Sequence, residues 1–219
     1  MNRKTYLKFF RALCGATLAT LFLATDPSAL AQTPLSLIAY WDFNDAGVAD
    51  QTKDKVKSYV GTLQNGVVYT ADQGGRSGQA GDRAANFGTG SGATRQIEIT
   101  DFMDAFNAAA AGDQISASIW VKWNVAVANS SAFWFVSPSS AGSGTRGFQA
   151  HTPWGGRQIF FDTAGCCVVP TQRLTFTPGG VDWLQWHHLA FVKSNEVKQV
   201  WIDGKLAGSN TGADPLPTD

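Results

Sequence analysis

The stretch WHHLAFVKSNEVKQVWIDGKLAG, residues 186–208, decides the fold class of this chain. It contains two apolar strands and the start of a third, and the dipeptide Asp203-Gly204 joins the last two. Both turn residues tolerate the positive φ that a type I′ hairpin requires. The stretch therefore predicts an antiparallel sheet, and it is typical of an extracellular β-sandwich.

Further strands are expected upstream of this hairpin. Residues 114–123 have the clearest pattern, because the odd positions from Ile115 to Val121 are apolar and the even ones are polar apart from Trp120. Turn residues separate the other expected strands, which are 36–43, 58–63, 67–70, 84–87, 96–100, 132–136, 147–151, 157–162 and 172–177. A polar loop is expected at 45–55, and a hairpin-type turn at Gln64-Asn65-Gly66.

Residues 101–110 are the one good helix candidate. Asp101 is placed to cap the N-terminus of this helix, and Gly112 is placed to end it. Phe102, Met103 and Phe106 fall on one face. About a dozen short strands with a single helix predict an all-β fold, a two-sheet antiparallel sandwich or jelly roll, and exclude alternating βαβ units.

The composition supports the same fold class. The 219 residues include 23 Gly, eight Trp and 14 Phe, but only two Glu, at positions 98 and 196. Helix-rich domains usually carry more Glu, Lys, Leu and Ala in periodic order. The sequence therefore offers little material for amphipathic helices.

The N-terminus has the pattern of a signal peptide. Arg3, Lys4, Lys8 and Arg11 precede a short apolar run at 12–24, and Ala29-Leu30-Ala31 provides an A-x-A cleavage signal. The apolar run is short for a bilayer span. We expect residues 1–31 to be removed after Ala31, which leaves no transmembrane anchor in the mature chain and places it outside the cytoplasm, secreted, periplasmic or at the cell surface.

The charge of the mature chain limits the class of partner. The whole sequence carries 17 basic and 17 acidic residues, and cleavage after Ala31 leaves 13 basic and 16 acidic ones, a formal charge of −3. Nucleic acids and anionic membranes require a basic patch. We therefore expect no nucleic-acid partner. By length the mature chain is one domain, which can bury roughly 70% of its unfolded surface.

Several motifs, weak individually but in a specific order, resemble those of the concanavalin A-like laminin G superfamily, in particular bacterial LamG-like jelly-roll domains. The resemblance covers about residues 36–208. The matching segments are Tyr40-Trp-Asp-Phe43, Gly75-Arg-Ser-Gly-Gln-Ala80, Ala85-Asn-Phe87, Ile115-Ser-Ala-Ser-Ile-Trp-Val-Lys122, Trp186-His-His-Leu-Ala-Phe-Val192 and Val200-Trp-Ile-Asp-Gly-Lys-Leu206.

The resemblance implies a two-sheet jelly roll at 32–210 that serves in binding or adhesion and sometimes holds Ca²⁺ at a sheet edge. Members of this family normally continue past the Asp-Gly hairpin to a last strand, which pairs beside the N-terminal one. Here residues 211–219 are instead expected to form a loop-like tail, because they contain two prolines. Either the domain is truncated, or the sandwich is open beside residues 36–43 and exposes a strand edge.

Cys166 and Cys167 are the only thiols once Cys14 has left with the signal peptide. In an exported protein we expect them not to remain free. They can form a vicinal disulfide, pair with another chain or bind a soft metal, and the first is our prediction. Adjacent Cα atoms are about 3.8 Å apart, below the usual disulfide range, so such a bond would be strained.

A ligand surface is expected where 147–157 joins two strands. Sugars bind by stacking on aromatic faces, with flanking polar groups that fix their hydroxyls. The residues that could supply such a set are Arg146, His151, Trp154, Arg157 and Asp162. The alternative is that Trp154 covers the end of the sandwich and Asp162 caps a turn. The tryptophans at 41, 120, 123, 183, 186 and 201 are interpreted as packing residues.

A calcium site is possible near the first expected strand. Ca²⁺ requires six or more oxygen ligands from carboxylates, carbonyls and water. Asp42, Asn44, Asp45 and Asp50 are clustered there in the sequence. The same residue types also form turns, which is their commoner use.

Catalytic signatures are weak. Glu98 and Glu196 are far apart, and no two Asp residues lie at i, i+2 on one strand, so the carboxylate pair of a glycosidase is missing. His187 and His188 are adjacent on an expected strand and must point to opposite faces, so they cannot chelate one ion; we expect one packed and one solvated. No G-x-S-x-G, HExxH, P-loop or EF-hand pattern occurs.

These observations favour an exported, non-catalytic binding or adhesion module whose ligand is a carbohydrate or an extracellular protein. Two alternatives remain open: a secreted polysaccharide-active enzyme of jelly-roll type, and a structural remnant of a larger surface protein. A convergent pair of carboxylates in a cleft would separate the enzyme from the other two.

Overall fold

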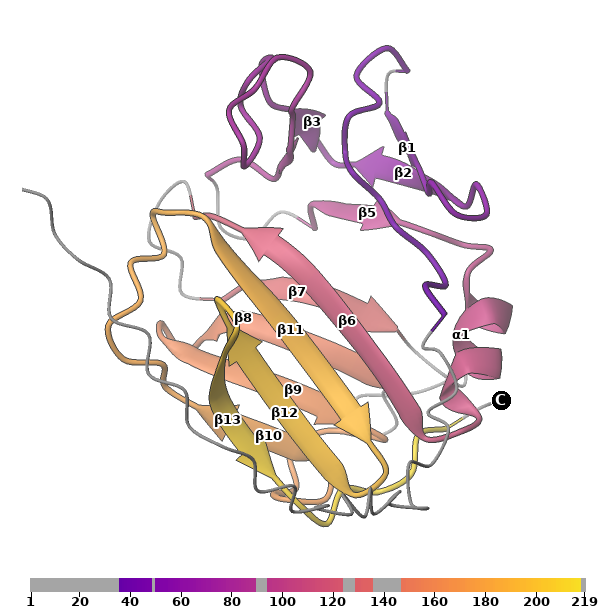
Figure 1. Ribbon diagram of the computed structural model, residues 1–219, viewed down its shortest axis with the longest axis vertical. Coiled ribbons are helices and arrows are strands. Elements are labelled where there is room, and N and C mark those ends of the chain that lie inside the picture. Colours follow the sequence, from indigo (N-terminus) through magenta and orange to yellow (C-terminus); the bar gives the residue numbers. More distant parts are fainter. Residues whose placement is uncertain (1–35, 49, 90–93, 124–128, 136–146, 218–219) are drawn as a thin grey trace, which may run out of the picture. The chain divides into compact units, whose positions relative to one another are not determined.

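The 186–208 stretch forms most of a four-stranded antiparallel sheet in the order β13-β12-β11-β6, called here the front sheet (Figure 1). Its strands are β6 (Gln114–Val121), β11 (His187–Ser194), β12 (Val197–Ile202) and β13 (Lys205–Asn210). Asp203 and Gly204 have φ of 49° and 75°, which confirms the type I′ turn. Burial alternates along all eight residues of β6, as the sequence predicts.

The structure, a computed structural model, describes residues 36–48, 50–89, 94–123, 129–135 and 147–217. Contacts divide the chain into Met1–Ser36 and Leu37–Asp219, and every described helix and strand lies in the second unit.

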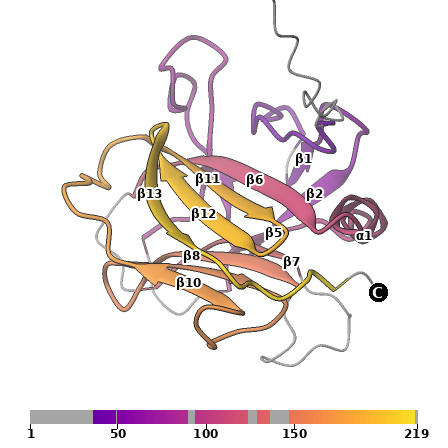
Figure 2. The ribbon, with the colours of Figure 1, turned by 60° about the horizontal axis from the view of Figure 1, so that its bottom comes forward.

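A second four-stranded antiparallel sheet, the back sheet, has the order β10-β9-β8-β7. Its strands are β7 (Ser131–Phe135), β8 (Phe148–Trp154), β9 (Gln158–Thr163) and β10 (Arg173–Phe176). Figure 2 shows the two sheets as separate layers that face each other. The predicted all-β, two-sheet antiparallel sandwich is therefore confirmed.

Aromatic side chains fill the space between the sheets. The Phe148 ring lies 5.0 Å from Phe133 and 5.2 Å from Phe161, all on the back sheet. Phe191 of β11 meets both Phe133 and Phe161 edge-on, at 5.1 and 5.5 Å. Edge-to-face pairs add to the hydrophobic gain from burial. This cluster fixes which face of each sheet is inner, and so which side chains point outward.

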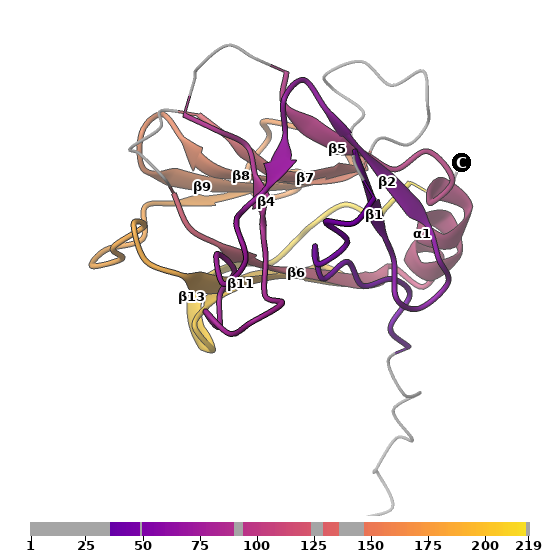
Figure 3. The same cartoon turned by 90° about the horizontal axis from the view of Figure 1, so that it is seen from above.

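Two smaller sheets and one helix flank the sandwich. The smaller sheets are β1-β2-β5 and β3-β4, and the helix α1 lies on the same side of the sandwich as β1 and β2 (Figure 3). These elements are β1 (Gln51–Lys53), β2 (Val60–Gln64), β3 (Val68–Tyr69), β4 (Ala85–Asn86), β5 (Gln96–Glu98) and α1 (Met103–Ala110).

Four local predictions are wrong. Residues 36–43 form no strand, because Trp41 makes only an isolated bridge with Asp54. The expected loop at 45–55 contains β1. The turn at 64–66 exists, but β2 pairs with β1 and β5 while β3 pairs with β4, so it joins two different sheets instead of closing a hairpin. Helix α1 starts from Phe102 with no side-chain cap, so Asp101 does not cap it.

Residues 211–217 form no strand, yet they pack against the end of the sandwich. Ala213 and Leu216 are buried. The Leu216 amide donates to the Asp113 carboxylate at 2.9 Å, and the Asp214 amide donates to the Thr171 carbonyl at 2.9 Å. This segment therefore closes one end of the core that the two sheets share.

Candidate functional site

The outer face of the back sheet carries a row of polar side chains. Gln149 of β8 pairs with Asp162 of β9, and Asp162 pairs in turn with Arg173 of β10. Cross-strand partners point to the same side of a sheet. The neighbouring residues Ala150 and Phe161 belong to the core, so this row faces away from the core.

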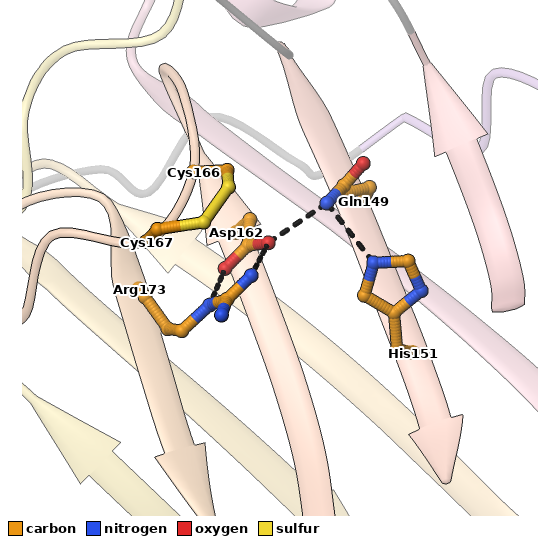
Figure 4. Close-up of a disulfide and its surroundings, with 6 residues drawn as sticks. All are labelled: Gln149, His151, Asp162, Cys166, Cys167 and Arg173. Atoms are coloured by element: carbon orange, nitrogen blue, oxygen red, sulfur yellow. Dashed lines mark hydrogen bonds and ion pairs between the residues drawn. A yellow bond between two sulfur atoms is a disulfide. The ribbon is translucent and has the colours of Figure 1, made fainter. Parts of the chain in front are cut away.

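A continuous chain of hydrogen bonds runs along the row (Figure 4). The Arg173 guanidinium donates to both oxygens of Asp162 at 2.6 Å, as a bidentate pair. The Gln149 amide Nε2 donates to Asp162 Oδ2 at 2.7 Å and contacts His151 Nε2 at 3.2 Å. Asp162 and Gln149 are fully buried. The two-pronged contact with Arg173 compensates the buried carboxylate.

The hydrogen bonds also assign the tautomer of His151. Since the Gln149 amide nitrogen can only donate, His151 Nε2 must accept. The proton of a neutral His151 ring is then on Nδ1, which donates to Ser131 Oγ at 2.9 Å. The network thus extends from the buried ion pair to Ser131, an exposed residue at the start of β7.

Aromatic rings cover this network at the surface. The Trp154 ring lies 4.5 Å from His151 and 6.4 Å from Phe160. The Arg173 guanidinium lies 4.1 Å above the Phe160 ring, within cation–π range. Trp154 remains 39% exposed, so one edge of this cluster is open to solvent.

Cys166 and Cys167 lie beside the network, on the loop between β9 and β10 (Figure 4). They are joined as a vicinal disulfide with a Cα–Cα distance of 3.7 Å. Gly165 and Cys167 both have positive φ, 127° and 84°, so the backbone reverses sharply here. The loop continues through Val168 and Val169, which are more than half exposed. The disulfide therefore directly precedes the exposed apolar residues Val168 and Val169 of this loop.

The structure brings together only part of the predicted ligand set. His151, Trp154 and Asp162 belong to one cluster, but His151 and Asp162 are buried and cannot touch a large ligand. Arg157 is exposed in the turn after Trp154, and Arg146 lies outside the described residues. Sequence reasoning missed Ser131, Gln149, Phe160 and Arg173. Their signal is cross-strand register, which appears only once the strands are paired.

A cavity of about 390 Å³ lies elsewhere, between the 177–181 loop and the β12–β13 hairpin. It contains none of the predicted ligand residues. Its lining is mixed, with Pro178 and Leu206 beside Asp203 and Lys205. The aromatic and hydrogen-bonding groups suited to a sugar converge at Trp154 instead, so that region is the better candidate.

The proposed calcium ligands have protein partners instead. The Lys55 ammonium lies 2.7 Å from Asp45 and 3.4 Å from Asp42. Burial would raise the pKa of Asp45, but the Lys55 contact and hydrogen bonds from the 52–53 segment outweigh it and lower that pKa. The Asn44 side-chain oxygen accepts the Arg83 amide at 2.8 Å. Asp50 contributes its backbone carbonyl to Leu63.

This arrangement indicates two carboxylates that are neutralised by Lys55, and it favours that interpretation over a calcium site. Across the described ranges, no group of three or more His, Cys, Asp or Glu side chains is placed to hold a metal ion.

The adjacent histidines point to opposite faces, as strand geometry requires. His187 Nδ1 lies 2.7 Å from Asp203, and its Nε2 lies 2.8 Å from the Asp182 carbonyl. His188 instead meets Trp120 with ring centroids 5.1 Å apart. Both are half-buried, so the expectation of one packed and one solvated ring is wrong.

The fold and this surface define a class: an antiparallel jelly-roll sandwich with an exposed aromatic ring beside fixed hydrogen-bond donors. A family model described as the concanavalin A-like lectin/glucanases superfamily matches residues 91–219, more than half of the chain. The chain therefore belongs to this superfamily. The match starts after the motifs at 40–43, 75–80 and 85–87 and runs beyond residue 208, where the resemblance seen in the sequence ends. No curated protein matches the chain.

None of the described helices is long and apolar enough to cross a membrane.

Proposed function

We propose that this protein is an exported, non-catalytic binding module that recognises a carbohydrate on the outer face of its back sheet. One observation carries the proposal: the exposed Trp154 ring is held by His151 and Phe160 beside the donors of Arg173 and Ser131. A fixed aromatic face with polar groups at its edge suits a sugar ring, which is apolar on its faces and rich in hydroxyls at its rim.

The polar groups have unused hydrogen-bonding capacity. Arg173 uses Nε and one terminal nitrogen for Asp162, which leaves the other terminal nitrogen as a donor. Ser131 accepts from His151, so its own proton can be donated to a ligand. The Gln149 side-chain oxygen is buried with no hydrogen-bond partner in the described parts of the chain. A water that reached Gln149 would relieve a desolvation cost of about 1–3 kcal/mol.

The same hydrogen bonds argue against hydrolysis by this cluster. A serine nucleophile needs a basic histidine nitrogen that faces it. Here Gln149 donates to Nε2 of His151, so Nδ1 carries the proton and faces Ser131 as a donor. Asp162 is buried and bound to Arg173, so it is unsuited to act as a general acid or base. The cluster is built to hold Trp154 in place.

The sugar site is tested with a glycan array, followed by calorimetry on the best oligosaccharide. Trp154→Ala should weaken binding about thirtyfold or more, since truncation of a central aromatic anchor costs about 2 kcal/mol or more. Trp154→Phe keeps a ring and should lose less. Thermal unfolding of each variant checks that the fold persists. Equal affinity of the alanine variant and the wild type would refute the site, and release of reducing sugar would refute the non-catalytic assignment.

Export is tested separately. The full chain is expressed in a secreting bacterium, and the N-terminus of the exported protein is sequenced. We expect it to begin at Gln32, because Ala29-Leu30-Ala31 provides the cleavage signal. Retention of the intact N-terminus in the cytoplasm would contradict export.

A further inference from the structure

Three tryptophans share the outer face of the front sheet. Leu189, Phe191 and Val200 face the core, so the alternate residues of β11 and β12 point outward. By cross-strand register, His188 lies beside Trp120, and Ala190 lies beside Trp201. Trp186 precedes β11 with the same parity as His188, and the Lys122 ammonium lies 5.3 Å above its ring. Trp120 is 42% exposed, so the prediction that it only packs inside the fold is incomplete.

Two cations rest on these rings. The Arg76 guanidinium lies 4.0 Å above the Trp120 ring, and Lys122 covers Trp186. In the described residues, no carboxylate lies within ion-pair distance of either cation. Two acidic groups lie nearby and have other hydrogen-bond partners. Asp82, in the same loop as Arg76, binds Ser77, and the charge of Arg76 helps to lower its pKa. Asp203 binds His187. Arg76 therefore interacts with Asp82 only at longer range, and neither Arg76 nor Lys122 has an ion-pair partner among the described residues.

The loop that carries Arg76 is held in a fixed shape. The Gly75 amide donates to the Asp82 carbonyl at 3.1 Å, and the Ser77 hydroxyl donates to the Asp82 carboxylate at 2.6 Å. A Cβ on Gly75 would lie 2.3 Å from the Asp82 side chain, so only glycine allows this approach. A binding group that is rigid before the ligand arrives loses less entropy on binding.

The charge of this face differs from that of the whole chain. The whole sequence has a formal net charge of 0, and removal of residues 1–31 would leave −3. Yet the outward-facing positions of β6, β11, β12 and β13 include no Asp or Glu. They are Gln114, Ser116, Ser118, Trp120, His188, Ala190, Val192, Ser194, Val197, Gln199, Trp201, Leu206 and Ser209. The face thus combines indole rings, small hydroxyls and two cations, and it excludes negative charge.

We propose that this face of the front sheet is a second binding site, and that its ligand is a polysaccharide whose sugars carry carboxylates. The uronate carboxylates pair with Arg76 and Lys122, and the sugar rings contact the exposed parts of Trp120 and Trp201. Guanidinium and carboxylate match in a bidentate geometry. Serine hydroxyls on β6 are placed to bond sugar hydroxyls. The site is separate from the one at Trp154, which lies on the opposite sheet, and does not depend on it.

Calorimetric titrations with polygalacturonate, alginate and hyaluronate oligosaccharides test this proposal. Fully methyl-esterified polygalacturonate is the matched probe, since it keeps the sugar chain and removes the charge. We expect at least one acidic chain to bind, its affinity to fall with added salt, and Arg76→Gln and Trp120→Ala each to weaken it at least tenfold. Trp154→Ala should leave this binding unchanged, which separates it from the proposed function.

Three outcomes would overturn the proposal. The first is that none of the three acidic chains binds. The second is that the esterified chain binds as tightly as the acidic one. The third is that Trp154→Ala abolishes binding of the acidic chain while Trp120→Ala leaves that binding unchanged. Arg76→Lys is the folding control, because it keeps the cation in an exposed loop. It should retain more affinity than Arg76→Gln.

Discussion

Two buried lysines of the front sheet have opposite effects on the stability of the fold. Lys193 and Lys198 lie directly opposite each other on β11 and β12, and both side chains are buried. Lys193 donates to both oxygens of Asp113, at 2.7 and 2.9 Å. Among the described residues, the one hydrogen-bond contact of the Lys198 ammonium is a long one, 3.5 Å, to the Thr171 carbonyl. Burial lowers the pKa of Lys198 to about 8, although Asp162 and Asp214 act in the opposite direction.

Replacing Lys198 with methionine should therefore stabilise the protein at pH 7. The folded-state pKa lies below the ordinary value of 10.5, so the folded state holds the proton less tightly than the unfolded state. The resulting penalty, roughly 3 kcal/mol, is fully present below pH 8 and fades as the pH rises to 10.5. Urea unfolding at pH 7 and pH 10 measures it, and the gain should be larger at pH 7.

Lys193→Met is the matched comparison, since it removes a paired lysine and leaves Asp113 without its cation. We expect a loss of about 2 kcal/mol. If both substitutions destabilise the protein equally at pH 7, the distinction between the two lysines is wrong.

The His187–Asp203 pair should make stability depend on pH within a defined window. Burial opposes the charge on His187, but the Asp203 carboxylate and the Asp182 carbonyl outweigh it and raise the His187 pKa above 6.5. The His187 side chain and the His188 amide lower the Asp203 pKa below 3.8. The histidine contribution is complete below pH 6.5 and is lost as the pH rises through the raised value. The aspartate contribution is lost as the pH falls through its lowered value.

His187→Gln should thus destabilise the protein more at pH 5.5 than at pH 8.5. Asp203 is nearly half exposed, so the effect should be under about 1 kcal/mol. Unfolding free energies at the two pH values provide the measurement. His188→Gln is the comparison, because its ring packs on Trp120 and its charge acts on Asp203 more weakly than that of His187, so its effect should differ less between the two pH values. A difference of the opposite sign would show that the pair does not act as described.

At the scale of elements, strands β13 and β10 are in close contact where Gly208 faces the Phe176 ring. A Cβ on Gly208 would lie 2.6 Å from the Phe176 ring, so these strands can approach only if residue 208 has no side chain. Gly208→Ala should cost about 1–3 kcal/mol through overpacking. Gly179→Ala has free space around it and should be close to neutral. Thermal unfolding compares the two variants, and equal stability would contradict the close approach.

The loop between β9 and β10 should contain an intact vicinal disulfide in the purified, unreduced protein. Its loop backbone already turns sharply at 164–167, which brings the two sulfur atoms together. Intact-mass analysis without reduction should give a mass two hydrogens below that of the dithiol, and no alkylation at Cys166 or Cys167. Full alkylation without reductant would show that the thiols are free.

Elements whose pairing is local could be predicted from the sequence, and those with remote partners could not. The β12–β13 hairpin follows from Asp203-Gly204, and β6 follows from its period of two. The 36–43 segment has an equally apolar pattern, but no strand among the described elements pairs with it beyond Trp41. The Gln64-Asn65-Gly66 turn forms as its residues predict, yet its flanking strands pair elsewhere. A local pattern does not specify a remote partner.

The candidate site shows the same limit at the scale of the whole molecule. Trp154, His151 and Asp162 could be selected because sugar sites need an aromatic ring with polar neighbours. Arg173 and Gln149 could not, since their link to Asp162 depends on the register of three strands. Burial also reverses two roles: His151 and Asp162 are residue types that bind ligands, but here they position the exposed groups. In the proposed site, the groups that contact the ligand are therefore Trp154, Ser131 and Arg173.

The proposed function requires a sugar ring to stack on Trp154. The most direct measurement is an NMR titration of the tryptophan indole N–H signals with the oligosaccharide selected on the array. The Trp154 signal is identified by its absence in Trp154→Phe. We predict that this signal shifts progressively and saturates with the same Kd as calorimetry. Saturating binding that leaves the Trp154 signal in place would contradict it.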